Sequence, residues 1–405
     1  MTTTPAFSVI IPVFNKWELT EACLRSLREH TPEYDYEVIV VDNASSDATA
    51  TELHFLGQSL FGARFRRIRF EQNRNFGPAC NAGAAVASAP LLFFLNNDTL
   101  LTPGWMPPLL AALAEDPKLG GVGPLLLYEN NTIQHLGVTF EPQSVHHLYQ
   151  DFPSDHPVAQ KRRYFQAITA AALLMPADLF RKHDGFYEEY RNGFEDVDLC
   201  LRIRATGKVF SCVLESVVYH LESRTVGRHD AEIDNALLLY RRCGHLFRPD
   251  KHVFGQEDGF VPFIDDAFDI RLRMTAEAET ALCREAKGLS IQHWHALTRA
   301  HPLWIAGREF LAQTLEQQGH ADDALFFWAE IGHIEMREER YERLIQAATQ
   351  AGNAKILALA EETHATLVIK KRDRARARNF LQRANEQRDS VLASLYEQVM
   401  KERFA

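Results

Sequence analysis

The fold is decided by the stretch Leu91-Leu92-Phe93-Phe94-Leu95-Asn96-Asn97-Asp98. An uninterrupted apolar run of this kind predicts a strand buried on both faces of a mostly parallel sheet. The run ends in two amides and a carboxylate, and ligands of open α/β sheets bind outside the carboxyl ends of the strands. Such oxygen ligands suit Mg²⁺ or Mn²⁺, which share their coordination shell with substrate phosphates. The alternative, a polar turn after a core strand, is weighed against the rest of the chain.

Strands and helices alternate on the N-terminal side of this stretch. The patterns predict strands at 7–15, 37–41 and 65–70 and helices at 17–29, 47–53 and 79–87. This alternation predicts an α/β domain whose parallel sheet carries helices on both faces, with the polar loops after the strands meeting on one edge. A dinucleotide-binding fold is excluded, because the first strand ends in Pro12-Val13-Phe14-Asn15 rather than in a glycine-rich turn.

The totals describe an ordinary globular protein. The chain has 405 residues with 46% hydrophobic and 24% charged residues, which suggests roughly two to three domains. No signal peptide and no apolar run of ~20 residues is visible, and the six cysteines form no CxxC pair. We therefore expect reduced thiols and a cytoplasmic location, with contact at the inner face of the membrane left open. The net charge of −10 argues against a nucleic-acid partner.

Three sequence blocks together resemble glycosyltransferase family 2, whose members are inverting enzymes with the GT-A fold. They are Ser8–Asn15, Val40–Ser45 and Asn73–Gly83. Asn96-Asn97-Asp98 is similar to a variant of the family's DxD metal motif, with Asn96 where the first aspartate is usual. The resemblance covers roughly residues 7 to 225 and implies a divalent metal, Mn²⁺ or Mg²⁺, with Asp98 as its one charged ligand in that motif.

The resemblance also implies the residues that bind the donor nucleotide. They are Pro12, Phe14, Asp42, Asn73, Gly77, Asn81, Asn97 and Asp98. Phe14 offers an aromatic face to a nucleobase, although a core position would explain it equally well. Asp42 would accept a hydrogen bond from the ring N–H of uracil or thymine, or else would cap the following turn. Gly77 would let the backbone approach the nucleotide, and Asn81 would point into the same crevice or would only fix the loop.

A second charged cluster, Glu195-Asp196-Val197-Asp198, begins a predicted helix. Acidic residues in a first helical turn are stabilised by the helix dipole, but three carboxylates within four residues exceed that need. The resemblance implies that Asp196 is the general base, while Glu195 binds an acceptor hydroxyl or shapes the pocket. Asp198 is expected to pair with Arg202, four residues along the helix.

Residues further along the chain complete the expected site. A buried strand is predicted at 167–176, and the polar stretch 141–163 is expected to be a mobile loop over the acceptor side. His220 resembles the histidine that closes the metal site in many GT-A enzymes, although a lone histidine at a strand end is more often structural. Arg224 and Arg228 would neutralise the phosphates.

The C-terminal part is expected to be all-helical. We divide the chain into a GT-A domain (1–250), a helical domain (251–365) and a basic C-terminal helix (366–405). The spacing of Gly319 and Gly352 lies within about a residue of the ~34-residue period of a tetratricopeptide repeat, and a generic stack of helical hairpins is the alternative. The basic run Lys370–Arg378 would contact an anionic membrane or an acidic partner, or would form a solvated helix face. Dimerisation through these helices stays open.

Together these features predict a metal-dependent, inverting glycosyltransferase. It would move a sugar from a UDP- or dTDP-sugar to a hydroxyl of a glycan or protein acceptor, in bacterial surface polysaccharide or glycoprotein synthesis. The alternative is a non-catalytic helical scaffold that carries a degenerate GT-A domain, and Asn96 is the one feature that favours it. Neither the donor sugar nor the acceptor follows from the sequence.

Overall fold

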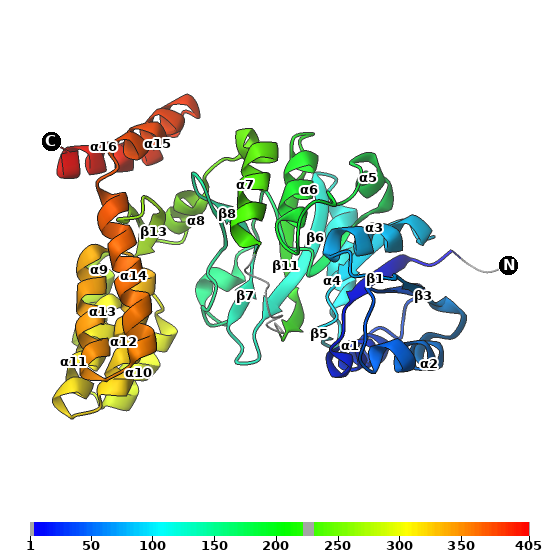
Figure 1. Cartoon of the computed structure of the whole chain (residues 1–405), viewed down its shortest axis with the longest axis horizontal. Coiled ribbons are helices and arrows are strands. Elements are labelled where there is room, and N and C mark those ends of the chain that lie inside the picture. Colours follow the sequence, from blue (N-terminus) through cyan, green and yellow to red (C-terminus); the bar gives the residue numbers. More distant parts are fainter. Residues whose placement is uncertain (1–3, 222–230, 405) are drawn as a thin grey trace. The chain divides into compact units, whose positions relative to one another are not determined.

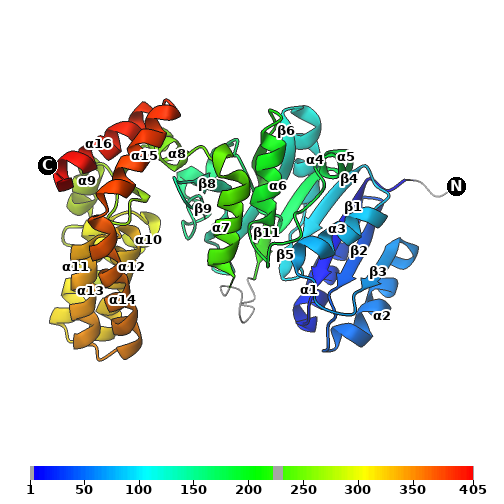
Figure 2. The same ribbon diagram turned by 45° about the horizontal axis from the view of Figure 1, so that its top comes forward.

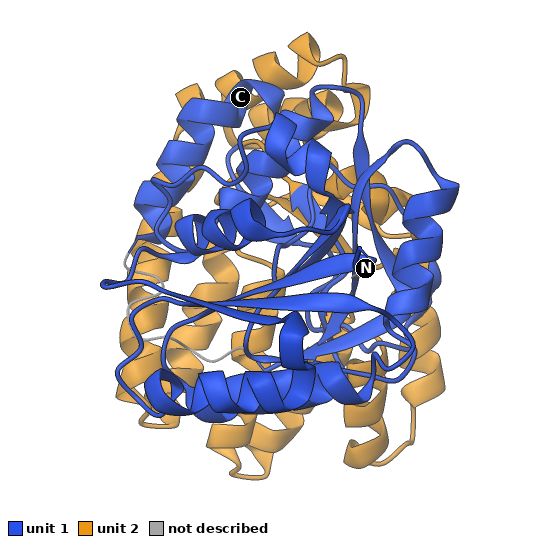
Figure 3. Ribbon diagram, turned by 90° about the vertical axis from the view of Figure 1, so that its right-hand side faces the viewer, with its two compact units in different colours: residues 1–139, 143–247 blue, residues 140–142, 248–405 orange. Residues whose placement is uncertain are grey.

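The computed structural model describes residues 4–221 and 231–404. The chain divides into two compact units (Figure 3). The first unit contains the chain up to Thr139 and residues Gln143–Phe247, and the second contains Phe140–Pro142 and the chain from Arg248 onward.

The first unit is built on a mixed sheet that has nine strands among the described residues (Figure 1). Its order is β3-β2-β1-β4-β10-β6-β11-β5, with β7 paired to β6. The strands are β1 (Phe7–Val13), β2 (Tyr36–Asp42), β3 (Phe65–Arg69), β4 (Leu91–Leu95), β5 (Thr99–Leu101), β6 (Leu119–Leu127), β7 (Ile133–His135), β10 (Ala172–Pro176) and β11 (Val209–His220). A separate two-stranded sheet pairs β8 (Val138–Phe140) with β9 (Val145–His147).

Strand direction determines which loops meet. Strands β1, β2, β3 and β4 are mutually parallel. β10 runs antiparallel to both β4 and β6, and β11 is parallel to β6. The strands β1, β2, β4, β6 and β11 therefore all end at the same edge of the sheet, which we call the carboxyl edge. β10 begins at this edge because it runs the other way.

Helices cover both faces of this sheet (Figure 2). The helices of the first unit are α1 (Trp17–Glu29), α2 (Thr49–Phe61), α3 (Phe76–Val86), α4 (Met106–Glu115), α5 (Ala177–Lys182), α6 (Glu195–Arg204) and α7 (Glu232–Cys243). Because successive strand residues point to opposite faces, Val9 and Ile11 pack in one core with residues of α1, α2 and α4. Ile10 points the other way, and Gly83 of α3 lies so close that an added Cβ would stand 2.6 Å from its Cγ2.

The sequence prediction of an α/β domain followed by helices is confirmed, and several details are corrected. The stretch 141–163, expected to be a loop, contains β9 and the 3-10 helix η2 (Pro157–Gln160). The strand predicted at 167–176 begins only at Ala172. β5 and α5 were not predicted, because three and six residues are too short for a periodic pattern to stand out.

The second unit contains a β-hairpin as well as helices. The hairpin strands are β12 (Val261–Ile264) and β13 (Ile270–Arg273), so the expectation that strands vanish after residue 250 is wrong. The helices are α8 (Lys251–Glu257), α9 (Ala276–Ala286), α10 (Ile291–Ala300), α11 (Ile305–Gln317), α12 (Ala321–Ile334), α13 (Glu338–Gln350), α14 (Ala354–Lys371), α15 (Arg374–Glu386) and α16 (Ser390–Phe404). Among the described helices, none is long and apolar enough to cross a membrane.

Two cores hold the second unit together. One is formed by residues of α9 to α14, and the other joins the β-hairpin to α15 and α16. Turns with a left-handed glycine close the hairpins α11–α12 and α13–α14, with φ of 82° at Gly319 and 66° at Gly352. The single basic helix expected at 366–405 is instead the end of α14 and two further helices, separated by a turn with Arg388 at φ 58°.

Candidate active site

The centre of the site is a carboxylate and an imidazole at the carboxyl edge. Asp98 follows β4 and His220 ends β11, and pairing of Thr99 with His220 brings the two residues together. Asp98 Oδ1 lies 3.0 Å from His220 Nε2. Both side chains are almost completely buried. The structure thus joins two residues 122 positions apart in the chain.

Two amides complete the surroundings of His220. Asn96 Nδ2 lies 3.2 Å from His220 Nε2, on the same side as Asp98. On the other side of the ring, Gln134 Oε1 lies 2.6 Å from Nδ1. Gln134 was not predicted, because a polar residue in a three-residue strand belongs to no motif.

The acidic cluster of α6 lies at the same edge. The backbone N–H of Asn96 donates to the carbonyl of Ala171, 2.8 Å away. The neighbouring Ala170 N–H donates to Asp196 Oδ2 over 2.9 Å. A hydrogen-bonded path therefore runs from the Asp98 motif to Asp196 across the loop that precedes β10. The two acidic clusters, predicted to converge from separate parts of the sequence, lie on one edge of one sheet.

The three carboxylates of α6 have different surroundings. Asp196 is partly exposed, and the Val197 N–H and the Ala170 N–H orient its two oxygens. Glu195 is buried and accepts from the N–H of Gly193 over 2.7 Å. Burial raises the pKa of the nearby Cys80 thiol, and the charges of Glu195 and Asp196 raise it further. Helix α3, which carries Cys80, lies beside the segment that precedes α6, because the Phe76 N–H at its start donates to Asn192 Oδ1 over 2.9 Å.

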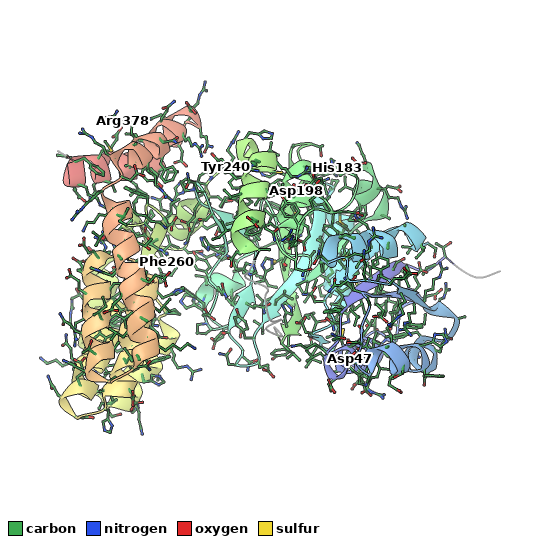
Figure 4. All side chains as sticks on the ribbon, viewed as in Figure 1. Asp47, His183, Asp198, Tyr240, Phe260 and Arg378 are labelled. Carbon is green, nitrogen blue, oxygen red and sulfur yellow. The ribbon has the colours of Figure 1, made fainter. Side chains whose placement is uncertain are left out.

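Asp198 is a structural carboxylate. It is fully buried among side chains of α6 and α7 (Figure 4), and it pairs with Arg202 at 2.6 Å and Arg242 at 2.7 Å. Tyr190 donates its hydroxyl to the same group over 3.1 Å. Burial opposes ionisation, but the two arginines outweigh it and lower the pKa of Asp198. The predicted pairing with Arg202 is confirmed.

Of the two residues expected to contact the base, Phe14 is exposed and Asp42 is buried. Phe14, just after β1, is 42% exposed at the carboxyl edge, so its ring face is available to a ligand. Asp42 is completely buried, and its oxygens accept from Ser45 N and from the guanidinium groups of Arg67 and Arg69. The structure does not present this carboxylate to a base.

The remaining predicted nucleotide residues mostly organise loops. Asn81 exchanges hydrogen bonds with the backbone of Phe186, through Oδ1 at 3.0 Å and Nδ2 at 2.8 Å, so it fixes the loop after α5. Gly77 is buried against the same loop. Asn97 donates to Thr20 of α1 over 2.8 Å. Pro12 is a buried residue of β1, and Asn73 is exposed and caps the local turn at Asn75. Arg224 and Arg228 lie outside the described residues.

A histidine pair beside the site, one buried and one partly exposed, was also not predicted. His135 of β7 and His147 of β9 have ring centroids 4.7 Å apart. The Thr169 N–H donates to His135 Nε2 over 3.2 Å. Thr169 lies in the loop before β10, next to Ala170, whose N–H donates to Asp196. Burial lowers the pKa of His135 well below its usual range, with help from the charges of His147 and His220. Both lie in the stretch between β6 and β10, where the sequence showed only short strands and a polar loop.

The comparisons with known proteins agree with this geometry. Residues 8–156 match the family model described as glycosyl transferase family 2. These residues include β1, β2, β4 and the Asp98 motif. The first unit contains a glycosyl transferase family 2 domain. The predicted GT-A type of fold is therefore confirmed for this unit.

Related proteins match part of this chain over part of their own lengths. The O-antigen biosynthesis protein RfbC of Myxococcus xanthus is 29% identical over 54% of this chain and 18% of its own length. A validoxylamine A glucosyltransferase of Streptomyces hygroscopicus is 27% identical over 58% of this chain and 55% of its own. The chain thus spans less than two thirds of the length of these relatives. The solved structure of GalNAc-T7 with UDP, GalNAc and Mn²⁺ aligns at 16% identity and a TM-score of 0.47, over 55% of this chain and 44% of that one.

The side chains of Asp98 and His220 fit a divalent cation. They direct one carboxylate oxygen and one imidazole nitrogen toward each other over 3.0 Å, and the Asn96 side-chain amide lies beside the same nitrogen. Oxygen and imidazole ligands of this kind suit Mn²⁺ and related cations. A cation held by these two side chains would have further coordination positions open to other ligands.

Proposed function

We propose that this chain is a metal-dependent, inverting glycosyltransferase that uses a nucleoside-diphosphate sugar. The observation that carries the proposal is a pair of hydrogen bonds at the carboxyl edge. The Asn96 N–H donates to the carbonyl of Ala171, and the Ala170 N–H donates to Asp196 Oδ2. They connect the loop of Asp98, the partner of His220, to the partly exposed carboxylate of Asp196. The match to glycosyl transferase family 2 supports it.

Asp196 takes the role of general base. Each of its oxygens accepts one backbone hydrogen bond, which fixes the carboxylate while leaving lone pairs for an incoming hydroxyl. Asp196 removes the proton as the acceptor oxygen attacks the anomeric carbon from the side opposite the diphosphate, and this single displacement inverts the configuration. A bound divalent cation would offset the charge that develops on the leaving diphosphate. Glu195, held by Gly193 N–H, shapes the acceptor pocket.

Phe14 is the proposed platform for the donor base, because its ring is exposed at the carboxyl edge. Asp42 then acts indirectly, by holding Arg67 and Arg69 beside the loop after β2. Since Asp42 was the residue that favoured uracil or thymine, we treat UDP- and dTDP-sugars as the first donors to test rather than as a fixed specificity.

For the acceptor we propose a hydroxyl of a glycan. The relative that takes part in O-antigen biosynthesis supports a surface polysaccharide as the product, and a protein acceptor is the alternative. The helical second unit would dock the acceptor or a second copy, and the arginines at the start of α15 would meet an anionic membrane surface.

A non-catalytic scaffold is less well supported. Its one argument is Asn96 in place of an aspartate in the metal motif. In the structure, however, Asn96 contacts His220 through Nδ2 and Ala171 through its backbone N–H. Asn96 is therefore an integrated part of the site and gives no sign of degeneration.

The test is release of nucleoside diphosphate from a panel of UDP- and dTDP-sugars with Mn²⁺, with and without candidate glycan acceptors. Asp196→Asn should lower the rate by about 10²–10⁴-fold, because a general base contributes that much. Asp178→Asn is the matched control, since Asp178 also lies in the first turn of a helix but its side chain is fully exposed. Equal rates for wild type and Asp196→Asn would refute the assignment, and no turnover of any donor would favour the scaffold.

A further inference from the structure

The buried residue Gln134 lies behind His220. Its strand, β7, pairs antiparallel with β6, the neighbour of β11, so the side chain reaches the end of β11 from the adjacent strand. Gln134 is only 4% exposed. A buried amide with no place in the reaction needs an explanation, because burying it costs free energy unless it is hydrogen-bonded.

Gln134 makes two contacts with the same residue. Its Nε2 donates to the backbone carbonyl of His220 over 3.3 Å, and its Oε1 lies 2.6 Å from Nδ1 of the His220 ring. The carbonyl oxygen only accepts hydrogen bonds, so the amide nitrogen must face it. If the amide were flipped, its oxygen would face the carbonyl oxygen of His220, and two acceptors would oppose each other. The oxygen of the amide is therefore the atom that faces Nδ1.

This orientation determines the tautomer of His220. An amide oxygen opposite Nδ1 requires a proton on Nδ1, and in the neutral ring the lone pair is then on Nε2. Nε2 is the atom that lies 3.0 Å from Asp98 Oδ1 and 3.2 Å from Asn96 Nδ2. Histidines that bind metals commonly donate their other ring N–H to a fixed acceptor in this way.

The amide is itself held in position. The backbone carbonyl of Gln134 lies 2.9 Å from Nδ1 of His147 on β9. Gln134 thus lies between Ile133 and His135, which both pair with β6, and its own carbonyl contacts His147 of β9. A fixed acceptor oxygen can select one tautomer, whereas a mobile amide could turn its nitrogen or its oxygen toward the ring and fit either tautomer.

We propose that Gln134 is a positioning residue that locks His220 in the Nδ1–H tautomer and so directs the Nε2 lone pair toward the cation site. The inference rests on the proposed metal site, with Asp98 and His220 as ligands. It assigns Gln134 no contact with substrate.

The first test leaves Gln134 unchanged and determines the tautomer of His220. In metal-free full-length Asp98→Ala, which lacks the carboxylate oxygen 3.0 Å from Nε2 that would itself favour a proton there, ¹H–¹⁵N spectra of the histidine rings at alkaline pH distinguish the two neutral tautomers, and the further change His220→Gln identifies the signals of His220. We expect the Nδ1–H form. Finding the Nε2–H form, or a mixture, would overturn the inference whatever the fate of the proposed reaction.

The second test measures binding of Mn²⁺ alone, from the loss of the free Mn²⁺ signal in electron paramagnetic resonance. Gln134→Met removes the acceptor and should weaken binding by roughly 10–100-fold, as outer-shell substitutions do. Gln134→Glu keeps an acceptor oxygen and should largely retain binding. Gln166→Met is the matched control, because Gln166 is equally buried at 4%.

The outcomes separate the two proposals. Unchanged Mn²⁺ affinity in Gln134→Met would overturn the positioning role and leave the proposed transferase intact. A wild-type protein that binds no Mn²⁺ would overturn the metal site and the positioning role together. Equal losses in Gln134→Met and Gln166→Met would show a general packing effect and would also overturn the role.

Discussion

Three carboxylates within four residues of α6 do different work, and their partners explain why. Asp196 is partly exposed and accepts only backbone N–H groups, whereas Asp198 is buried between two arginines. The proposed mechanism uses the first carboxylate for proton transfer, whereas the second joins α6 to α7 through its ion pairs. The same type of side chain therefore has different surroundings two residues apart.

Asp198→Ala should destabilise the first unit strongly, because it removes the buried carboxylate that pairs with Arg202 and Arg242, whose side chains are 23% and 28% exposed. Breaking a buried ion pair costs about 3–5 kcal/mol. Urea denaturation followed by circular dichroism measures this loss. Asp196→Asn, which removes no ion pair, should change the free energy of unfolding much less. A similar stability for both variants would contradict the division of roles.

At the residue scale, motifs predicted part of the site. Asp98, Asp196 and His220 were named because each belongs to a pattern with a chemical meaning. Gln134 was not, because its importance comes only from pairing of β7 with β6. Asp42 was assigned to the base from the family resemblance, and no sequence pattern shows that Arg67 and Arg69, on the next strand, pair with it.

At the scale of elements, close helix–strand contacts depend on glycine. Gly57 of α2 lies over the ring of Phe65 on β3, where an added Cβ would stand 2.2 Å from the ring. Gly57→Val should therefore destabilise the protein by about 1–3 kcal/mol through overpacking. Thermal unfolding checks this, with Gln58→Val, an exposed position of the same helix, as the control. Equal effects of the two substitutions would show that valine's helix propensity, rather than the contact, is responsible.

The turn of the β12–β13 hairpin carries Asp269, a carboxylate whose ionised form is unfavourable in the folded state. Burial, followed by the charges of Glu141 and Asp265, raises the pKa of Asp269 to about 6. Because the folded value lies above the unfolded value of about 3.9, this group lowers stability as pH rises through about 6.

Asp269→Asn should therefore stabilise the second unit at pH 7, by roughly 1–3 kcal/mol, and should have little effect below pH 4. Unfolding of the full chain at both pH values measures the difference. If Asp269→Asn lowers the free energy of unfolding at pH 7, the prediction is wrong, because removing an unfavourable charge should raise it.

The hairpin also shows a limit of sequence patterns. Val261–Ile264 and Ile270–Arg273 are four residues each and lie among helical segments, so their alternation is too short to be distinguished. The same holds for the break between α15 and α16, where Arg388 adopts the left-handed conformation without a glycine to mark it.

At the scale of the whole molecule, the sequence predicted the succession of an α/β unit and a helical region, because strand–helix alternation and its end are long-range patterns. It did not predict that Phe140–Pro142, from the middle of the first unit, belong to the second. Glu141 there is fully buried and accepts from Lys251 and from the N–H of Ile270. Such an exchange of chain between units depends on contacts distant in sequence.

The most direct test of the central claim is the anomalous scattering of Mn²⁺ in crystals of the full chain grown with Mn²⁺ and UDP. We expect a peak bound by Asp98 Oδ1 and His220 Nε2, next to the diphosphate and on the same edge as Asp196. A peak only at the metal-capable cluster Glu338, Glu342 and His364 of the second unit, with none between Asp98 and His220, would contradict the claim.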